Sequence, residues 1–174
     1  MRNLLTLLLL LVLGTSASAR GVYQTQDDFL AEVFAGSPPQ AAVVWLRGEV
    51  KATAAAILGH DYPALRIRYW GKGKRTAWIL EEIGKEKPIT VGLVVDDNTL
   101  RSIRVLEFRE SRGWEVRHGF FTDQFSGARL TGGQELDRSI DGISGATLSV
   151  RALEKLARLA LYLHSQTPFA HDPP

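Results

Sequence analysis

The chain has 174 residues, which is enough for one domain with a hydrophobic core but few for two. Its 21 Lys and Arg residues nearly balance its 19 Asp and Glu residues, and a net charge of +2 does not indicate nucleic-acid binding. The absence of cysteine excludes disulfides, thiolate metal sites, c-type haem attachment and a cysteine-linked flavin.

Residues 1–19 have the pattern of a secretory signal peptide. Arg2 precedes an apolar run over residues 4–13, and the segment ends in Ala17-Ser18-Ala19, an A-x-A cleavage pattern. The apolar run is too short to cross a bilayer as a helix. We therefore expect residues 1–19 to be cleaved and the mature protein to be periplasmic. An uncleaved N-terminal anchor is the alternative.

The first part of the remaining chain mixes helical and strand patterns. Acidic residues precede apolar positions over residues 27–35, which predicts a short amphipathic helix with Asp27 near its N-cap. An apolar run at residues 40–47 predicts a strand. The alanine-rich residues 50–58 favour a helix, which Gly59 would end in the C′ position.

Two β-hairpins are predicted in the middle of the chain. Residues 65–70 and 75–82 alternate apolar with polar side chains, and the glycine-bearing turn 71–74 joins them. Residues 89–95 and 100–108 form a second pair around a polar Asp-Asp-Asn turn by the same logic.

The next helical pattern comes only at the end of the domain. Over residues 147–164 apolar side chains recur at three- and four-residue steps, as in a helix that packs on a sheet. Early helices, antiparallel hairpins and one closing helix indicate an α+β fold, with a mainly antiparallel sheet and packed helices. The domain is expected to cover residues 20–166, and residues 167–174 are expected to be a disordered tail.

The run Asp141-Gly142-Ile143-Ser144-Gly145-Ala146-Thr147-Leu148-Ser149 lies directly before this last helix. The first N–H groups of a helix have no intrahelical acceptor, and the helix dipole adds partial positive charge there, so a helix start can hold a phosphate. Gly145 lets the backbone approach an anion closely, and Ala146 leaves that approach unobstructed. Thr147 then presents a hydroxyl beside the expected anion site.

Thr147 is not expected to act as a catalytic nucleophile by itself. A threonine hydroxyl is a weak acid that needs a base or a metal, and the sequence places no such cluster near it. The four histidines lack ligand-like spacing such as i, i+4 on a helix. The sequence therefore predicts no catalytic residue and no metal site, and phosphoryl chemistry at Thr147 requires a partner enzyme.

The Ser-Gly-Ala-Thr-Leu-Ser run before a helix resembles the flavinylation motif of the FMN-binding domain family. That family includes the periplasmic C subunit of the sodium-pumping NADH:quinone reductase, the G subunit of the Rnf complex and periplasmic regulators. In it, the threonine in the place of Thr147 takes FMN through a phosphoester. A magnesium-dependent periplasmic transferase installs the FMN from FAD.

The resemblance extends upstream of the motif. Residues 103–108, 110–116 and 121–127 are similar to the family's strand, glycine turn and Q-F-x-G element, in the same order. One departure lies in the turn, where the respiratory subunits carry E-T-P-G and this chain has Glu110-Ser111-Arg112-Gly113.

This resemblance implies covalent FMN on Thr147, held through its phosphate. The implied cofactor contacts are Ser144, Gly145, Ala146, Leu148, Ser111, Gly113 and Trp114. The aromatic side chains of Trp114, Phe120 and Phe121 offer apolar surface for the isoalloxazine ring. The implied partners are the magnesium-dependent FAD:protein FMN transferase and a redox protein, which could be a membrane electron-transfer complex or a cytochrome.

A simpler interpretation exists for each of these residues. Ser144 or Thr147 could cap the helix by accepting a backbone N–H, with Gly145 permitting the bend. The three aromatic residues could belong to the core, and Arg151, four residues after Thr147, is more typical of a solvated arginine than of a phosphate ligand.

Three functions follow from these alternatives. The first is a periplasmic flavoprotein that carries FMN on Thr147 and shuttles electrons between redox partners. The second is a reductase domain whose FMN acts directly on a periplasmic substrate, and the third is a non-redox binding or adaptor module in which the motif is only a cap.

Overall fold

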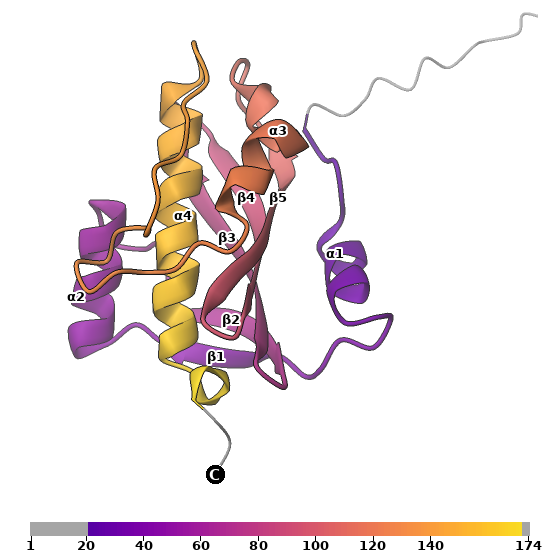
Figure 1. Ribbon diagram of the computed structural model, residues 1–174, viewed down its shortest axis with the longest axis vertical. Coiled ribbons are helices and arrows are strands. Elements are labelled where there is room, and N and C mark those ends of the chain that lie inside the picture. Colours follow the sequence, from indigo (N-terminus) through magenta and orange to yellow (C-terminus); the bar gives the residue numbers. More distant parts are fainter. Residues whose placement is uncertain (1–20, 172–174) are drawn as a thin grey trace, which may run out of the picture.

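The computed structural model describes residues 21–171, which form one antiparallel sheet with helices on both faces (Figure 1). The five strands follow each other in the sheet in chain order, and every neighbouring pair is antiparallel. The strands are β1 (Ala42–Trp45), β2 (Arg66–Lys72), β3 (Arg75–Ile83), β4 (Pro88–Asp96) and β5 (Thr99–Phe108). The predicted α+β fold with a mainly antiparallel sheet is confirmed.

Both predicted hairpins are present, and their turns are shorter than predicted because the strands extend further into them. The β4–β5 pair places Asp96 opposite Thr99, so the loop is only Asp97-Asn98. Both loop residues have positive φ, +49° and +58°. Two-residue loops of this kind match the twist of the flanking strands, and Asn and Asp tolerate positive φ better than most residues.

Helix α4 (Thr147–Ser165) packs its apolar face on the sheet, chiefly against β3 and β4. Helix α2 (Gly48–Leu58) flanks α4 and ends at Gly59, which has a left-handed φ of +79°, as predicted. The main core lies between α4 and the sheet, where Trp78, Leu93 and Leu153 are among its fully buried side chains. Burial of such a helix face supplies most of the helix stability.

Helix α1 (Gln26–Val33) covers the opposite face of the sheet (Figure 1). Its N-cap is Thr25, whose hydroxyl oxygen accepts the Asp28 N–H at 3.1 Å, so the cap lies two residues before the expected Asp27. The Phe29 ring packs closely on Gly92 of β4, where a Cβ would come within 2.7 Å of it. This second, smaller core places the sheet between two apolar layers.

Three short helices after β5 were not predicted. They are the 3₁₀ helix η1 (Trp114–Arg117), helix α3 (Gly119–Thr122) and the 3₁₀ helix η2 (Asp123–Phe125). Each has at most four residues. Such turns are too short to show a 3.6-residue period, which explains why the sequence pattern missed them.

The end of the described chain differs from the expected disordered tail. Residues 168–170 form a 3₁₀ helix, and the Asn98 side-chain amide donates to the Ala170 carbonyl at 3.1 Å. The Phe169 ring packs edge-on to Tyr69 and fills the space that a side chain at Gly71 would need. Phe169 and Ala170 are therefore packed against the hairpins of the sheet, whereas residues 172–174 and the expected signal peptide lie outside the described residues. Within residues 21–171, no helix is long and apolar enough to cross a membrane.

His164 on α4 is a fully buried titratable group. Its Nδ1 lies 2.8 Å from the Thr76 hydroxyl, which accepts the Trp78 indole N–H at 2.8 Å. Nδ1 is thus hydrogen-bonded to the Thr76 hydroxyl, whereas the described residues offer no hydrogen-bond partner for Nε2. Burial lowers the pKa of His164 from 6.5 to about 4.

Acidification should therefore destabilise the protein through His164. Because the pKa is lower in the folded state, the unfolded chain binds the extra proton first, and stability is lost as the pH falls below 6.5 toward about 4. The free energy of unfolding should drop by roughly 2 kcal/mol between about pH 7 and about pH 5 through this residue. Urea denaturation at both pH values measures it. His164→Gln should remove most of this drop, and an equal drop in the variant would contradict the assignment.

Candidate functional site

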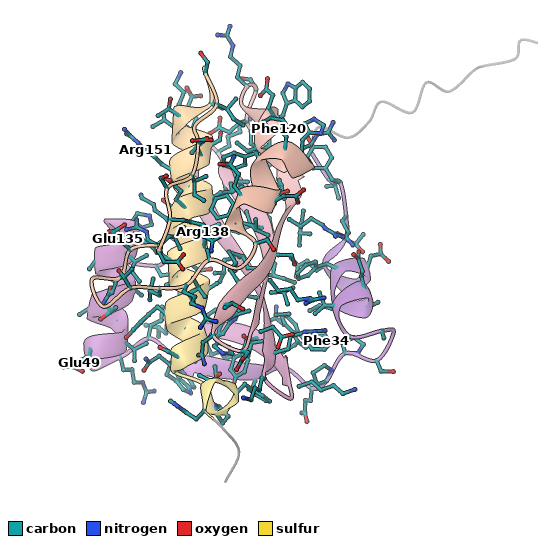
Figure 2. The ribbon with its side chains drawn as sticks, viewed as in Figure 1. Phe34, Glu49, Phe120, Glu135, Arg138 and Arg151 are labelled. Carbon is teal, nitrogen blue, oxygen red and sulfur yellow. The ribbon has the colours of Figure 1, made fainter. Side chains whose placement is uncertain are left out.

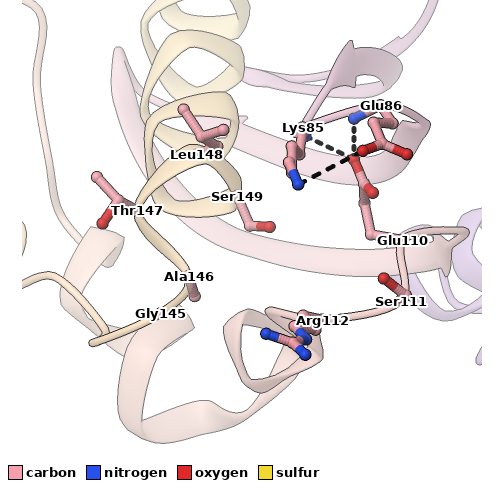
Figure 3. Close-up of a pocket in the computed structure, with 10 residues that line it drawn as sticks. All are labelled: Lys85, Glu86, Glu110, Ser111, Arg112, Gly145, Ala146, Thr147, Leu148 and Ser149. Atoms are coloured by element: carbon pink, nitrogen blue, oxygen red, sulfur yellow. Dashed lines mark hydrogen bonds and ion pairs between the residues drawn. The ribbon is translucent and has the colours of Figure 1, made fainter.

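A pocket of about 590 Å³ lies at the N-terminal end of α4 (Figure 3). Three segments that are distant in sequence build it: the β3–β4 turn, the loop after β5 and the start of α4. Its lining residues are Lys85, Glu86, Glu110, Ser111, Arg112, Gly145, Ala146, Thr147, Leu148 and Ser149.

The start of α4 has no side-chain cap. The N-cap residue is Ala146, whose own N–H donates to the Ile143 carbonyl at 2.9 Å, and neither Ser144 nor Thr147 accepts a backbone N–H. Within residues 21–171, no acceptor is placed against the N–H groups of Thr147, Leu148 and Ser149. The capping interpretation is therefore wrong, and three backbone donors remain available to an anion at the pocket.

Two hydroxyl groups flank this helix start. Thr147 is exposed, and in Figure 3 its side chain lies on the side of the helix away from Lys85 and Arg112. Ser149 is buried, and its side chain lies on the side that faces Ser111 and Arg112. Of the two, Thr147 presents the hydroxyl that a second protein can reach.

Glu110 holds the β3–β4 turn in place across the pocket. Its Oε1 accepts the backbone N–H groups of Lys85, Glu86 and Lys87 at 2.5, 2.6 and 2.9 Å. Burial alone would raise the pKa of Glu110, but these three N–H bonds outweigh it and the pKa lies below its ordinary value. The charge of Glu110 is thus compensated by the turn. The second acidic group of the lining, Glu86, pairs with Lys85 at 3.4 Å.

The structure brings together most of the residues that the sequence assigned to the site. Thr147, Gly145, Ala146, Leu148 and Ser111 line the pocket, whereas Ser144, Gly113 and Trp114 are not part of its lining. Gly113 lies behind the wall, where it packs against the start of α4. Trp114 comes next to it, 44% exposed, with the Arg117 guanidinium over its ring.

The other candidate residues, Phe120, Phe121 and Arg151, do not line the pocket. Phe121 is fully buried and packs edge-on to Phe125 in the core, so it offers no surface to a cofactor. Phe120 is 66% exposed at the edge of the molecule (Figure 2). Arg151 is exposed on α4 and does not line the pocket, as expected for a solvated side chain (Figure 2).

Half of the residues that line the pocket were not predicted from the sequence as site residues. They are Lys85, Glu86, Glu110, Arg112 and Ser149. Lys85 and Glu86 looked like ordinary turn residues, since nothing local shows that Glu110 binds their N–H groups. Ser149 had a signal, because it carries a hydroxyl within the first helical turn after Thr147.

These features define an α+β domain with a pocket at the uncapped start of a sheet-packed helix. Residues 84–162, which run from the β3–β4 turn through most of α4, match the FMN-binding domain family. No curated protein sequence matches the chain.

Solved structures share the fold. NqrC of Shewanella oneidensis superimposes with a TM-score of 0.56 at 14% identity, over 79% of this chain and 85% of that one. The NqrC counterpart from Parabacteroides distasonis, which belongs to a Na⁺-translocating NADH-quinone reductase, superimposes with a TM-score of 0.51 at 19% identity, over 78% and 83%. The likeness therefore extends beyond residues 84–162 to most of the described chain.

Two glycines at the pocket form a matched pair for mutation. Gly113 and Gly145 have nearly the same φ, +83° and +80°, but a Cβ at Gly113 would lie 2.7 Å from Ser149 Oγ, whereas nothing lies within 4 Å of one at Gly145. Gly145→Ala should cost only the backbone strain, about 1 kcal/mol. Gly113→Ala should cost at least about 1 kcal/mol more, because it also displaces the start of α4. Urea denaturation gives both values, and equal losses would contradict this packing.

Proposed function

We propose that this protein is a periplasmic flavoprotein that carries FMN covalently on Thr147 and passes electrons between redox partners. The observation that carries the proposal is an exposed threonine hydroxyl at an uncapped helix start, inside a segment that matches the FMN-binding domain family. The family resemblance of the Ser-Gly-Ala-Thr run supplies the covalent link.

The residues of the pocket fit a phosphate ester at this position. The unbonded N–H groups of the first turn of α4 and the helix dipole favour an anion there. Arg112, which has no ion-pair partner among the described residues, adds a cation on the facing wall. Leu148, 44% exposed on the first turn, offers apolar surface beside the same hydroxyl.

Attachment requires a second protein, because the pocket holds no free base beside Thr147. A transfer from FAD would join Thr147 Oγ to the phosphorus of the FMN half, break the pyrophosphate P–O bond, and release AMP and the hydroxyl proton. The carboxylates of Glu110 and Glu86 are held by backbone N–H groups and by Lys85. The magnesium-dependent FAD:protein FMN transferase of the resemblance would supply the base and the metal.

Electron carriage fits the pocket better than substrate turnover. Bound FMN can accept and return electrons, and the protein sets its position and surroundings. The described lining offers this cofactor hydroxyls, cations and N–H donors, while its carboxylates are already engaged. The similar solved structures include a subunit of a sodium-translocating NADH-quinone reductase, which supports a membrane redox complex as the partner. The signal-peptide pattern of residues 1–19 supports the periplasmic location.

Replacement of Thr147 tests the covalent link directly. Wild-type protein made together with an active transferase should gain the mass of one FMN less one water, and its band should fluoresce after denaturing electrophoresis. Thr147→Ala should lose both signals, while Thr147→Ser, which keeps a hydroxyl, should retain them. Since the Thr147 side chain makes no cap, the free energy of unfolding should change by less than about 1 kcal/mol.

Ser139→Ala is the matched control, since Ser139 is an exposed hydroxyl in the segment before the motif. It should be labelled like the wild type. Bare wild-type protein from cells with active transferase would overturn the proposed function.

A further inference from the structure

The Gln124 side chain connects two segments that are distant in sequence. Its Oε1 accepts the backbone N–H of Asp141 at 2.7 Å. Asp141 is the first residue of the run that leads to Thr147. The hydrogen bond therefore joins the η2 helix after β5 to the beginning of the segment that presents the hydroxyl.

The backbone on both sides of Gln124 is held in place by the core and by β5. The flanking Phe121 and Phe125 are fully buried, and their rings pack edge-on at 5.5 Å. Directly after η2, the Gly127 N–H donates to the Leu100 carbonyl at 2.7 Å, and the Leu100 N–H donates to the Ala128 carbonyl at 2.8 Å. These contacts tie the backbone on both sides of Gln124 to the core and to β5.

The segment that Gln124 holds has little support of its own. Residues 129–146 contain no helix or strand, only a single bridge between Leu130 and Leu136. Gly142 and Gly145 add backbone freedom close to Thr147. Among the described residues, Gln124 is the one side chain that hydrogen-bonds the backbone of residues 139–146. Without it, the path from Asp141 to α4 depends on Ile143 packing and the Ala146 turn.

We propose that Gln124 is a positioning residue for flavin attachment: its bond to Asp141 fixes the path of residues 141–146 and thereby presents the Thr147 hydroxyl in one orientation. This rests on the proposed function. A segment that samples many paths presents the hydroxyl in the reactive orientation less often, so attachment slows in proportion to the lost population. Gln124 acts before the transfer and touches neither FAD nor the forming Oγ–phosphorus bond.

Two variants of Gln124 separate the effect of its acceptor oxygen from the effect of its side-chain length. Gln124→Met keeps the length and removes the acceptor, whereas Gln124→Glu keeps an oxygen acceptor for the Asp141 N–H. Each unlabelled protein is incubated with transferase, FAD and Mg²⁺, and the labelled fraction is followed by intact mass. Loss of one such hydrogen bond should slow labelling of Gln124→Met by about two- to ten-fold. Gln124→Glu should stay within about two-fold of the wild type.

Hydrogen exchange of the Asp141 amide gives a readout independent of the transferase. In the unlabelled protein, this amide should exchange about two- to ten-fold faster in Gln124→Met, while the amides of α4 keep their protection. Gln166→Met is the matched control, because Gln166 lies at the far end of α4. It should change neither the labelling rate nor the Asp141 exchange.

The possible outcomes distinguish this inference from the proposed function. If wild-type protein is not labelled at all, the proposed function fails. If the wild type is labelled and Gln124→Met is labelled at the same rate, only the role of Gln124 is wrong. Slower labelling with unchanged Asp141 exchange would also overturn it, since Gln124 would then act on the transferase. Gln124→Ala removes the same acceptor and carries the test if the Met variant does not fold.

Discussion

The uncapped start of α4 is the feature on which the pocket depends. A side chain at Ser144 or Thr147 could have satisfied the first N–H groups of the helix, and such a cap is worth about 1 kcal/mol. The protein can do without it because the opposite side of α4 is anchored by fully buried side chains such as Leu153 and Leu156. Packing on the sheet stabilises the helix, and its start remains available to a phosphate. An anion bound there would satisfy the donors and add to the stability of the folded protein.

One wall of the pocket, and the segment that leads into the start of α4, are each held by a side chain that binds distant backbone groups. Glu110 gathers three N–H groups of the β3–β4 turn, and Gln124 binds the N–H of Asp141. Each acceptor stands on a segment fixed to β5, and each donor belongs to a segment without regular structure. The sheet edge thus organises both the turn that faces the helix and the segment that leads into it. Shape at the pocket is consequently set by a few directional bonds rather than by a continuous apolar core.

The sequence predicted what local pattern and composition control. Alternation found the hairpins, and three- and four-residue steps found α4. The glycine-bearing run before α4 located the pocket, because an anion site at a helix start is a local property. The remainder depends on contacts between distant residues. Glu110 and Gln124 lie in segments that resemble the family's turn and Q-F-x-G element, but their hydrogen bonds were not predicted, since their partners lie more than ten positions away. The packing of Phe169 was missed for a similar reason, since the residues that it contacts, Tyr69 and Gly71, belong to β2 and are distant in sequence.

The turn at residues 110–113 explains how this chain tolerates arginine where the resembling respiratory subunits have proline. A proline would restrict the backbone of the turn by fixing its own φ. Here the turn is held at both ends instead, by the bonds of Glu110 before it and by the contact of Gly113 with Ser149 after it. The residue at position 112 is therefore not needed to hold the turn, and the Arg112 side chain lines the pocket as a cation (Figure 3). With Glu86 and Glu110 already paired, Arg112 adds an uncompensated positive charge opposite the helix start. Arginine in place of proline therefore removes a restriction on the backbone and adds a positive charge to the pocket wall that faces the start of α4.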